Sequence, residues 1–91
     1  MQLNEMERRI ARCAEFQRVF QTPDGQKVYS ELKQRAGFNS DPFSPDPYTT
    51  AYNCGMIAII KFIDNILNED IKKWSNELKK QKTLLKETEN A

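Results

Sequence analysis

The sequence predicts an all-α fold: a small helical domain whose N-terminal helical hairpin, about residues 4–20 and 23–36, packs on a long third helix beginning near Pro47, followed by a C-terminal helical extension. Two observations lead to this prediction. Apolar residues recur at three- and four-residue spacing through most of the chain, which is the period of an amphipathic helix. In two places a residue that caps helices precedes a proline, at Thr22-Pro23 and at Asp46-Pro47, and this pair is a helix start signal.

The first helix is amphipathic, and Asn4 can cap its start with Glu7 as the capping-box partner. Whether Thr22-Pro23-Asp24-Gly25 is a turn or the opening of a second helix, it ends the first helix near Phe20. A joint of only about two residues favours an antiparallel hairpin. The second helix is short, because Gly37 follows it as a left-handed C-cap.

The segment from Gly37 to Pro47 is predicted to be a loop. It holds three of the four prolines, and the residue before a proline is biased away from helical geometry. Phe38 and Phe43 are unusual in a solvated linker. We expect them to pin the loop to the helices of the chain, with contact to a neighbouring molecule as the alternative.

The third helix is predicted to be the backbone of the molecule. Its middle is apolar on nearly every side, so we expect this part to be buried inside the fold or between subunits. Gly55 costs a helix interior about 1 kcal/mol relative to alanine, and the simplest compensation is the close approach of another helix. The predicted centre of the fold consists of Ile10, Phe16, Phe20, Val28, Leu32, Tyr52, Ile59, Ile63 and Ile66.

Beyond Leu67 the apolar stripe thins. Asn68 could cap a fourth helix, or the third helix could continue, and the sequence leaves open whether residues 47–82 form one helix or two. We divide the chain into a helical domain, residues 1–70, and a lysine-rich C-terminal helical extension, residues 71–91.

The composition excludes several classes of enzyme. With no histidine, the chain has no Ser-His-Asp or Cys-His arrangement and no histidine-ligated zinc. Cys13 and Cys54 could meet across two helices, but buried free thiols are the favoured interpretation. No glycine-rich phosphate loop is present. We expect a non-enzymatic protein without metal or cofactor, whose acidic residues cap helices or face water: Asp41, Asp46, Asp64, Glu69 and Asp70.

Charge is unevenly distributed, with net values of +2, −4 and +3 in residues 1–36, 37–70 and 71–91. Such asymmetry suits docking onto other copies or onto another protein. The longest apolar run, residues 56–60, is far below the roughly 18 residues that span a bilayer, and no apolar stretch of signal-peptide length follows Met1. We therefore expect a protein partner, no membrane association and a cytoplasmic site of assembly.

The C-terminal extension carries a cluster of lysines around Trp74. Such a basic aromatic patch can bind phosphates and stack on bases, although a solvated helix face explains it equally well. Trp74 lies in phase with Ile71 and Leu78, which favours an apolar contact for its ring. Nucleic acid is thus a possible but weak partner, with these candidate contacts: Lys72, Lys73, Lys79, Lys80 and Lys82.

Two blocks of the sequence resemble a small phage domain family known from tailed podoviruses of the Bordetella phage type. One block runs from Phe16 through the Thr22–Gly25 joint to Leu32, and the other is the segment 46–56 with its alanine-tyrosine and glycine pattern. Cys54 and Met56 stand where that family commonly has charged residues beside the glycine. The resemblance spans about residues 16–67. It implies a phage-encoded protein of the virion morphogenesis region, incorporated into the particle or needed for it, with no catalytic residues to transfer.

The sequence therefore predicts a non-enzymatic structural or assembly protein of a tailed phage, located in the virion and acting by helix-mediated contacts with other copies or other virion components. Two alternatives remain open: an internal or DNA-contacting virion protein that uses the lysine-rich helix, and a small regulator that binds a host protein. The predicted interface consists of Tyr48, Tyr52, Gly55, Met56, Ile57, Ile60 and Trp74.

Overall fold

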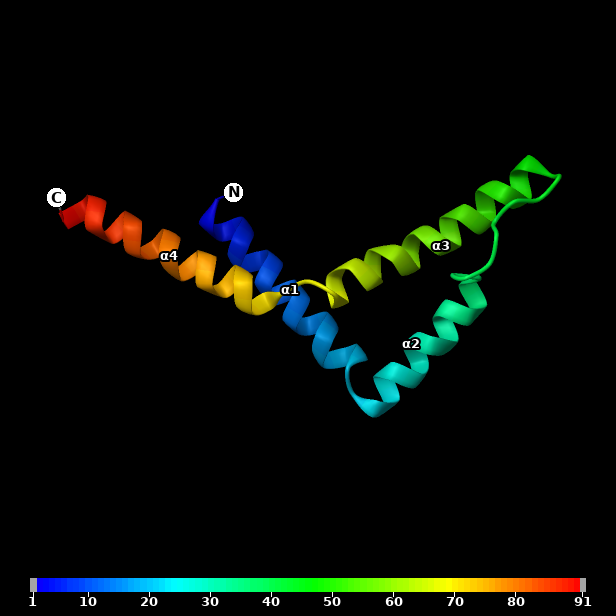
Figure 1. The fold of residues 1–91 in the computed structure, drawn as a ribbon, viewed down its shortest axis with the longest axis horizontal. Helices are drawn as coiled ribbons and strands as arrows, with labels where there is room; N and C mark the ends of the chain where they lie inside the picture. Colours follow the sequence, from blue (N-terminus) through cyan, green and yellow to red (C-terminus); the bar gives the residue numbers. More distant parts are fainter. Residues whose placement is uncertain (1, 91) are drawn as a thin grey trace.

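The computed structural model describes residues 2–90 and, within that range, contains four α-helices and no strand (Figure 1). The helices are α1 (Leu3–Phe20), α2 (Pro23–Ala36), α3 (Pro47–Leu67) and α4 (Ile71–Asn90). The all-α fold class is confirmed, and residues 47–82 form two helices rather than one. The predicted lysine-rich extension, residues 71–91, starts at the first residue of α4. Its last residue, Ala91, and the first residue of the predicted domain, Met1, lie outside the described part of the chain.

The four helices form a flat, elongated molecule. The Cα atoms extend over 65 × 32 × 14 Å. The Cα atoms of one α-helix lie within a cylinder about 4.6 Å across, so the shortest extent has room for two helices packed about 8–10 Å apart. In Figure 1, α2 runs back along α3 and α4 runs back along α1, while α1 crosses the junction between α3 and α4. The Cα radius of gyration is 18.6 Å, compared with about 12 Å for a compact domain of this length.

The joint between α1 and α2 follows the predicted capping. The Thr22 hydroxyl accepts a hydrogen bond from the Gly25 amide (3.0 Å) and donates one to the Val19 carbonyl (3.2 Å), and Pro23 takes the first helical position. A Cβ at Gly25 would overlap the Val19 carbonyl oxygen and lie 2.9 Å from the Phe20 Cα. Only glycine therefore fits where the chain turns this closely. The two arms of the hairpin touch at this joint and open away from it (Figure 1).

The loop between α2 and α3 is attached by polar side chains. The Thr50 hydroxyl accepts from the Ser44 amide (2.9 Å), and the Asn53 amide group donates to the Pro42 carbonyl (3.2 Å). Phe43 is 74% exposed, so the prediction that it pins the loop is wrong. Phe38 is half-buried. The loop is thus attached to α3 by hydrogen bonds, rather than by the ring of Phe43.

Three predicted caps can be compared with the structure. Asp46 caps α3 as predicted, accepting from the Tyr48 amide at 3.2 Å. Asn4 does not cap α1. The helix begins at Leu3, one residue before Asn4, and its N-cap position is occupied by Gln2. Asn68 is the C-cap of α3, and the carboxylate that accepts from the first turn of α4 belongs to Asp70, whose Oδ1 lies 3.0 Å from the Lys73 amide nitrogen.

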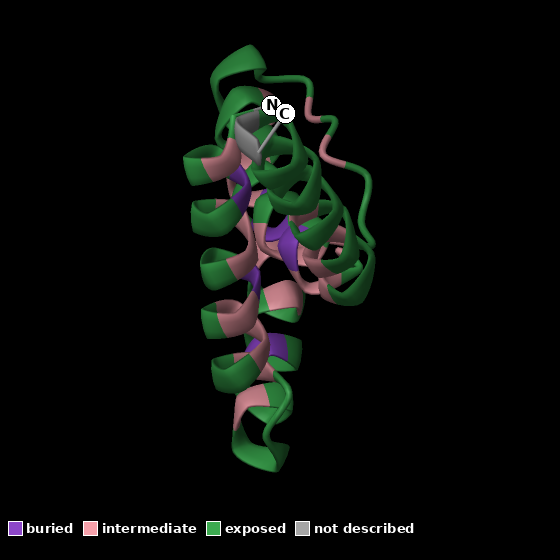
Figure 2. Ribbon diagram, turned by 90° about the vertical axis from the view of Figure 1, so that its left-hand side faces the viewer, coloured by how far each residue is buried: buried purple, intermediate pink, exposed green. Residues whose placement is uncertain are grey.

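Few side chains are buried, as Figure 2 shows by the scarcity of purple. Of the predicted centre, Ile66 is buried, and four residues are half-buried: Ile10, Phe16, Phe20 and Ile63. The other four are exposed and were predicted wrongly: Val28, Leu32, Tyr52 and Ile59. So flat and extended a molecule buries only a narrow stripe of each helix, and that stripe is formed by other residues. With Ile66, the buried core comprises Met6, Cys13, Tyr29, Ile57 and Ile60.

The error in α3 has a physical cause. Its middle is apolar all round, so periodicity does not indicate which side faces inward. In α2 the inward residue is Tyr29, whose ring packs 5.3 Å from that of Phe20 and whose hydroxyl reaches α3. This aromatic contact rotates α2 so that Val28 and Leu32 face solvent.

We predict that Gly25→Ala lowers the free energy of unfolding by about 1–3 kcal/mol, because the added methyl overlaps backbone atoms of the joint. Urea unfolding followed by circular dichroism measures the loss. Ser30→Ala, which removes only a hydroxyl from the exposed side of α2, serves as the control and leaves stability within about 0.5 kcal/mol. Equal stabilities of the two variants would contradict the steric argument.

Candidate functional site

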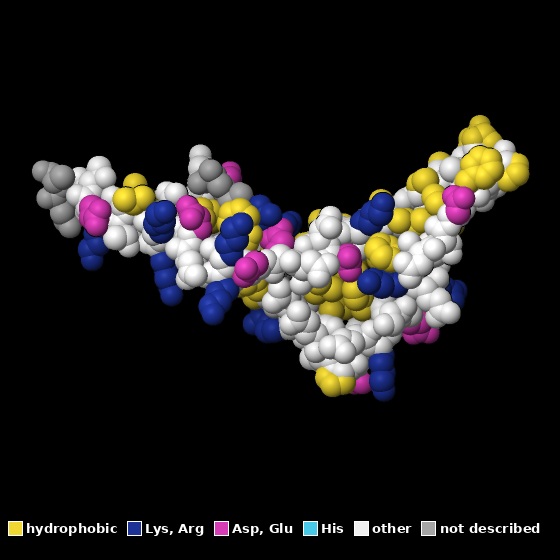
Figure 3. All heavy atoms as spheres, viewed as in Figure 1, with side chains coloured by type: hydrophobic (Ala, Val, Ile, Leu, Met, Phe, Trp, Pro, Cys, Tyr) yellow, Lys and Arg dark blue, Asp and Glu magenta, His cyan; other side chains and the backbone are white. Residues whose placement is uncertain are grey.

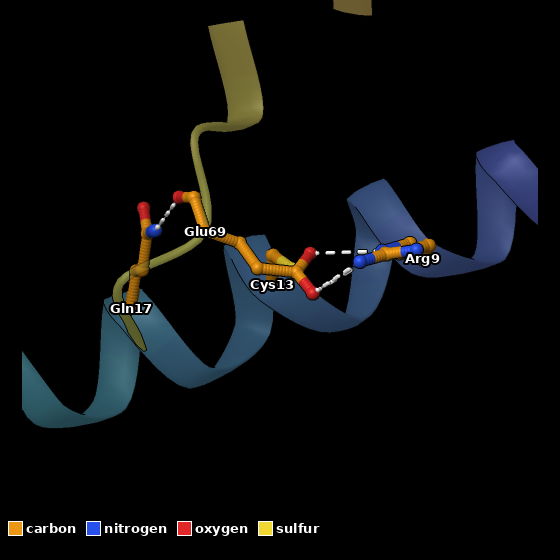
Figure 4. Close-up of polar contacts among 4 residues, drawn as sticks. All are labelled: Arg9, Cys13, Gln17 and Glu69. Atoms are coloured by element: carbon orange, nitrogen blue, oxygen red, sulfur yellow. Dashed lines mark hydrogen bonds and ion pairs between the residues drawn. The ribbon is translucent and has the colours of Figure 1, made fainter. Parts of the chain in front are cut away.

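The densest polar cluster joins α1 to the short linker between α3 and α4. Arg9 donates through Nε and Nη2 to both carboxylate oxygens of Glu69, at 2.8 to 3.2 Å, and the Cys13 thiol donates to Oε2 at 3.0 Å (Figure 4). One turn further along α1, the Gln17 amide donates to the Glu69 carbonyl (3.4 Å). Three successive turns of α1 thus hold a single linker residue. We call these four residues the Glu69 clasp.

The electrostatics of the clasp follow from these contacts. The hydrogen bonds from Arg9, and then from Cys13, hold the pKa of the Glu69 carboxyl below its ordinary value. The hydrogen bond to Glu69 raises the pKa of Arg9. Burial, followed by the hydrogen bond to Glu69, raises the pKa of the Cys13 thiol to about 11, so Cys13 stays protonated at neutral pH and is a poor nucleophile.

Arg9 also covers Trp74, its guanidinium carbon lying 4.3 Å from the ring centroid. An arginine over an indole face makes a favourable cation–π contact. The contact connects the clasp to the first turn of α4 and occupies that face of the ring, which is therefore not available for stacking on a base. Further along α4, an exposed ion pair links Lys82 to Glu7 of α1 at 3.0 Å.

A second polar cluster joins α2 to α3. The Tyr29 hydroxyl donates to Asp64 Oδ1 at 3.0 Å, and the Lys33 ammonium lies 3.3 Å from the same oxygen. Burial, and then the hydrogen bond to Asp64, raises the pKa of Tyr29 to about 12. Two of the five singled-out carboxylates, Asp64 and Glu69, thus hold helices together, and Asp46 and Asp70 cap helices.

Within residues 2–90, no three cysteine, aspartate or glutamate side chains gather as metal ligands. The two cysteines are both free and do not meet: Cys13 is buried, whereas Cys54 is exposed on α3, contrary to its expected burial. None of the helices in the described chain is both long and apolar enough to cross a membrane.

The predicted interface residues separate onto two sides of α3 and onto α4. Ile57 and Ile60 belong to the core of the chain itself, Met56 is half-buried, and Trp74 lies under Arg9. Tyr48, Tyr52 and Gly55 face outward. Nothing within 4 Å would meet a Cβ at Gly55, so the close approach expected there is not made by another described part of the chain.

The outward side of α3 is a continuous apolar strip. Exposure reaches 84% at Tyr48, 68% at Tyr52, 62% at Ile59 and 49% at Phe62. Figure 3 shows hydrophobic side chains gathered along the arm that α3 forms. The strip, called here the outer face of α3, consists of exposed residues at successive helical turns: Tyr48, Ala51, Tyr52, Gly55, Ala58, Ile59 and Phe62.

Sequence reasoning missed Ala51, Ala58, Ile59 and Phe62 as members of this surface. A signal was available, because the steps from Tyr48 to Phe62 alternate four, three, four and three residues through Tyr52, Gly55 and Ile59. The predicted nucleic-acid contacts of α4 are exposed: Lys72, Lys73, Lys79, Lys80 and Lys82.

Comparison with protein families gives one match. The family described as Bbp19-like phage protein matches residues 16–76, more than half of the chain. The chain belongs to this family. It is therefore a phage-associated protein, and its predicted membership of a phage protein family is confirmed. No curated protein and no solved structure matched the chain. The family match extends beyond the segment expected from the resemblance, through Glu69 and Trp74, whereas Arg9 and Cys13 precede it.

We predict that Glu69→Gln lowers the free energy of unfolding by about 1–3 kcal/mol at pH 7, because Arg9 loses its charged acceptor. The folded-state pKa of Glu69 lies below its ordinary value of 4.5, so its contribution is complete above pH 4.5 and is lost as the pH falls through the folded-state value. The difference between wild type and variant therefore shrinks in acid. Urea titrations at pH 7 and pH 3 measure it.

Glu31→Gln, at an exposed position on α2, is the control for removing a carboxylate and leaves stability nearly unchanged. A loss in Glu69→Gln of equal size at pH 7 and pH 3 would mean that the ionised carboxylate does not hold the junction.

Proposed function

We propose that this protein is a non-enzymatic structural or assembly protein of a tailed phage that acts by helix-mediated contacts in a multi-subunit particle. The observation that carries the proposal is the outer face of α3. Monomeric proteins rarely expose so continuous an apolar strip, and such strips mark interaction sites. Its three aromatic residues, including Tyr48 and Tyr52, belong to the residue types enriched at protein interfaces.

The shape of the chain supports the same proposal. A compact protein of 10.6 kDa exposes about 5,500 Å², whereas this chain exposes 7165 Å². The excess is about 1,700 Å², roughly twice the area of about 800 Å² that a standard protein–protein interface buries on each partner. Helix α3 is apolar on its outer side as well as on its inner side. A further surface that covers the outer side therefore stabilises the protein. Other virion components, or other copies of the chain, provide such surfaces within a particle.

The test is whether the protein is part of the particle. We expect mass spectrometry of gradient-purified, nuclease-treated particles from the encoding phage to detect the chain at a fixed ratio to the major capsid protein. Deleting its gene is expected to yield incomplete particles, with complementation by the wild-type gene as control. Absence of the chain from particles and assembly intermediates, together with normal particle yield after deletion, would contradict the proposal and favour a regulator of a host protein.

The exposed lysines of α4 favour a second candidate, a virion protein that contacts DNA through phosphates. Because Arg9 covers Trp74, this candidate rests on charge rather than base stacking. It predicts duplex binding at low salt that weakens steeply as salt is added and is lost in Lys79→Glu. Lys27→Glu on α2 is the matched control and retains binding. A fluorescence anisotropy titration that finds no binding at low salt would exclude this candidate.

A further inference from the structure

We propose that the outer face of α3 pairs with the same face of a second copy, with the two α3 helices antiparallel about a two-fold axis close to Gly55. The inference rests on the proposed function, of which it names the partner. It starts from the order of side chains along the strip. The small residues Ala51, Gly55 and Ala58 lie in the middle part of the strip, where they alternate with Tyr52 and Ile59, and aromatic residues lie at both ends.

The centre of the strip is shaped for close contact between helices. Ala51, Gly55 and Ala58 are exposed, and a Cβ at Gly55 would meet nothing within 4 Å. Glycine costs an exposed helix interior about 1 kcal/mol relative to alanine, and the described chain gains no packing at this position in return. Small residues permit two helix backbones to approach closely, and such an approach would compensate for the cost.

The ends of the strip are complementary in the antiparallel arrangement. Tyr48 precedes Gly55 by seven residues, and Phe62 follows it by seven. Reversing one helix about Gly55 therefore brings Tyr48 of one copy level with Phe62 of the other. Tyr52 and Ile59, three residues before and four after Gly55, come level in the same way. A contact of this kind is isologous, since each copy contributes the same residues to both halves.

Charge favours the antiparallel arrangement over the parallel one. At the Phe62 end, the Arg12 guanidinium lies 5.8 Å from the ring centroid, and Lys61 is exposed next to Phe62. At the Tyr48 end lies the exposed carboxylate of Asp46. Antiparallel pairing places the two basic residues of one copy at the level of Asp46 in its partner, whereas parallel pairing would gather four basic groups at one end.

The large apolar side chains of the strip supply roughly half of the area that a standard interface buries on each partner. A standard interface buries about 800 Å² on each partner. Fully burying an aromatic side chain removes about 150–250 Å² from solvent, and the outer face of α3 presents three such side chains and Ile59, each about half exposed or more. Phe43, 74% exposed in the loop before α3, adds apolar surface on the side where the helix begins.

The first test is the mass of the full-length chain across a concentration series in sedimentation equilibrium. We expect a dimer of twice 10.6 kDa for the wild type. Ile59→Asp is expected to raise the dissociation constant on the order of tenfold or more while helicity is unchanged, because it places a charge in the interface. Val28→Asp, the same change at an exposed position on α2, stays dimeric. A wild-type monomer, or an Ile59→Asp dimer as tight as wild type, overturns the inference.

The second test addresses the axis near Gly55. Position 55 faces its own symmetry mate, so Gly55→Glu and Gly55→Lys are each expected to be folded monomers through repulsion of like charges. An equimolar mixture of the two variants is expected to form a heterodimer. No recovery of the dimer on mixing, or dimers formed by each variant alone, overturns the placement of the axis.

The third test addresses orientation. Cys54 lies beside Gly55 on the edge of the strip, and antiparallel pairing brings both copies of Cys54 to the same side of the dimer, whereas parallel pairing separates them. We expect a short bis-maleimide to give a covalent dimer that is lost in Cys54→Ser. Buried Cys13, bonded to Glu69, does not react in the native protein. A dimer that resists this cross-linking overturns the antiparallel arrangement.

Failure of this inference is distinguishable from failure of the proposed function. A monomer in solution that is found in purified particles contradicts self-pairing but leaves the particle role in place. A stable dimer absent from particles and assembly intermediates contradicts the particle role but leaves the pairing in place.

Discussion

The clasp around Glu69 is the interaction on which the arrangement of the helices depends. Helix α3 ends at Leu67 and α4 begins at Ile71. The three-residue linker alone does not determine the direction of α4. Hydrogen bonds from three successive turns of α1 fix the linker residue, and Arg9 continues from its carboxylate to the ring of Trp74. The Arg9 guanidinium therefore contacts both the junction and the first turn of α4.

The local structure was predictable because local chemistry determines it. Thr22 with Pro23, Asp46 with Pro47, and Gly37 at φ 68° occupy the capping positions that their residue types favour. These signals depend on a few neighbouring residues, so the single sequence contains them in full. The bounds of α2 and the start of α3 follow directly, whereas α1 begins without a side-chain cap and its start was misplaced.

The packing was less predictable because it depends on residues distant in sequence. Glu69 meets Arg9 across sixty positions, and Tyr29 meets Asp64 across thirty-five. Considered alone, each of these polar residues would be expected at the solvent-exposed surface. No regular sequence spacing indicates that Arg9 and Glu69, or Tyr29 and Asp64, are in contact. Burial was misjudged for a related reason. An apolar residue is expected to face a core, but so flat and extended a molecule has too little interior to hold Ile59 and Tyr52 as well as Ile57 and Ile60.

The same thinness gives α3 two separable roles. Ile60 is 4% exposed and Ile59 is 62% exposed, although they are adjacent in sequence and identical in type. The difference arises from the turn of the helix, which directs Ile60 toward the core shared with α2 and leaves most of Ile59 exposed to solvent. Residues that stabilise the chain thus alternate with residues that face outward. Helix α3 has more apolar residues than the core of the chain requires. A partner on its outer side would account for the remainder.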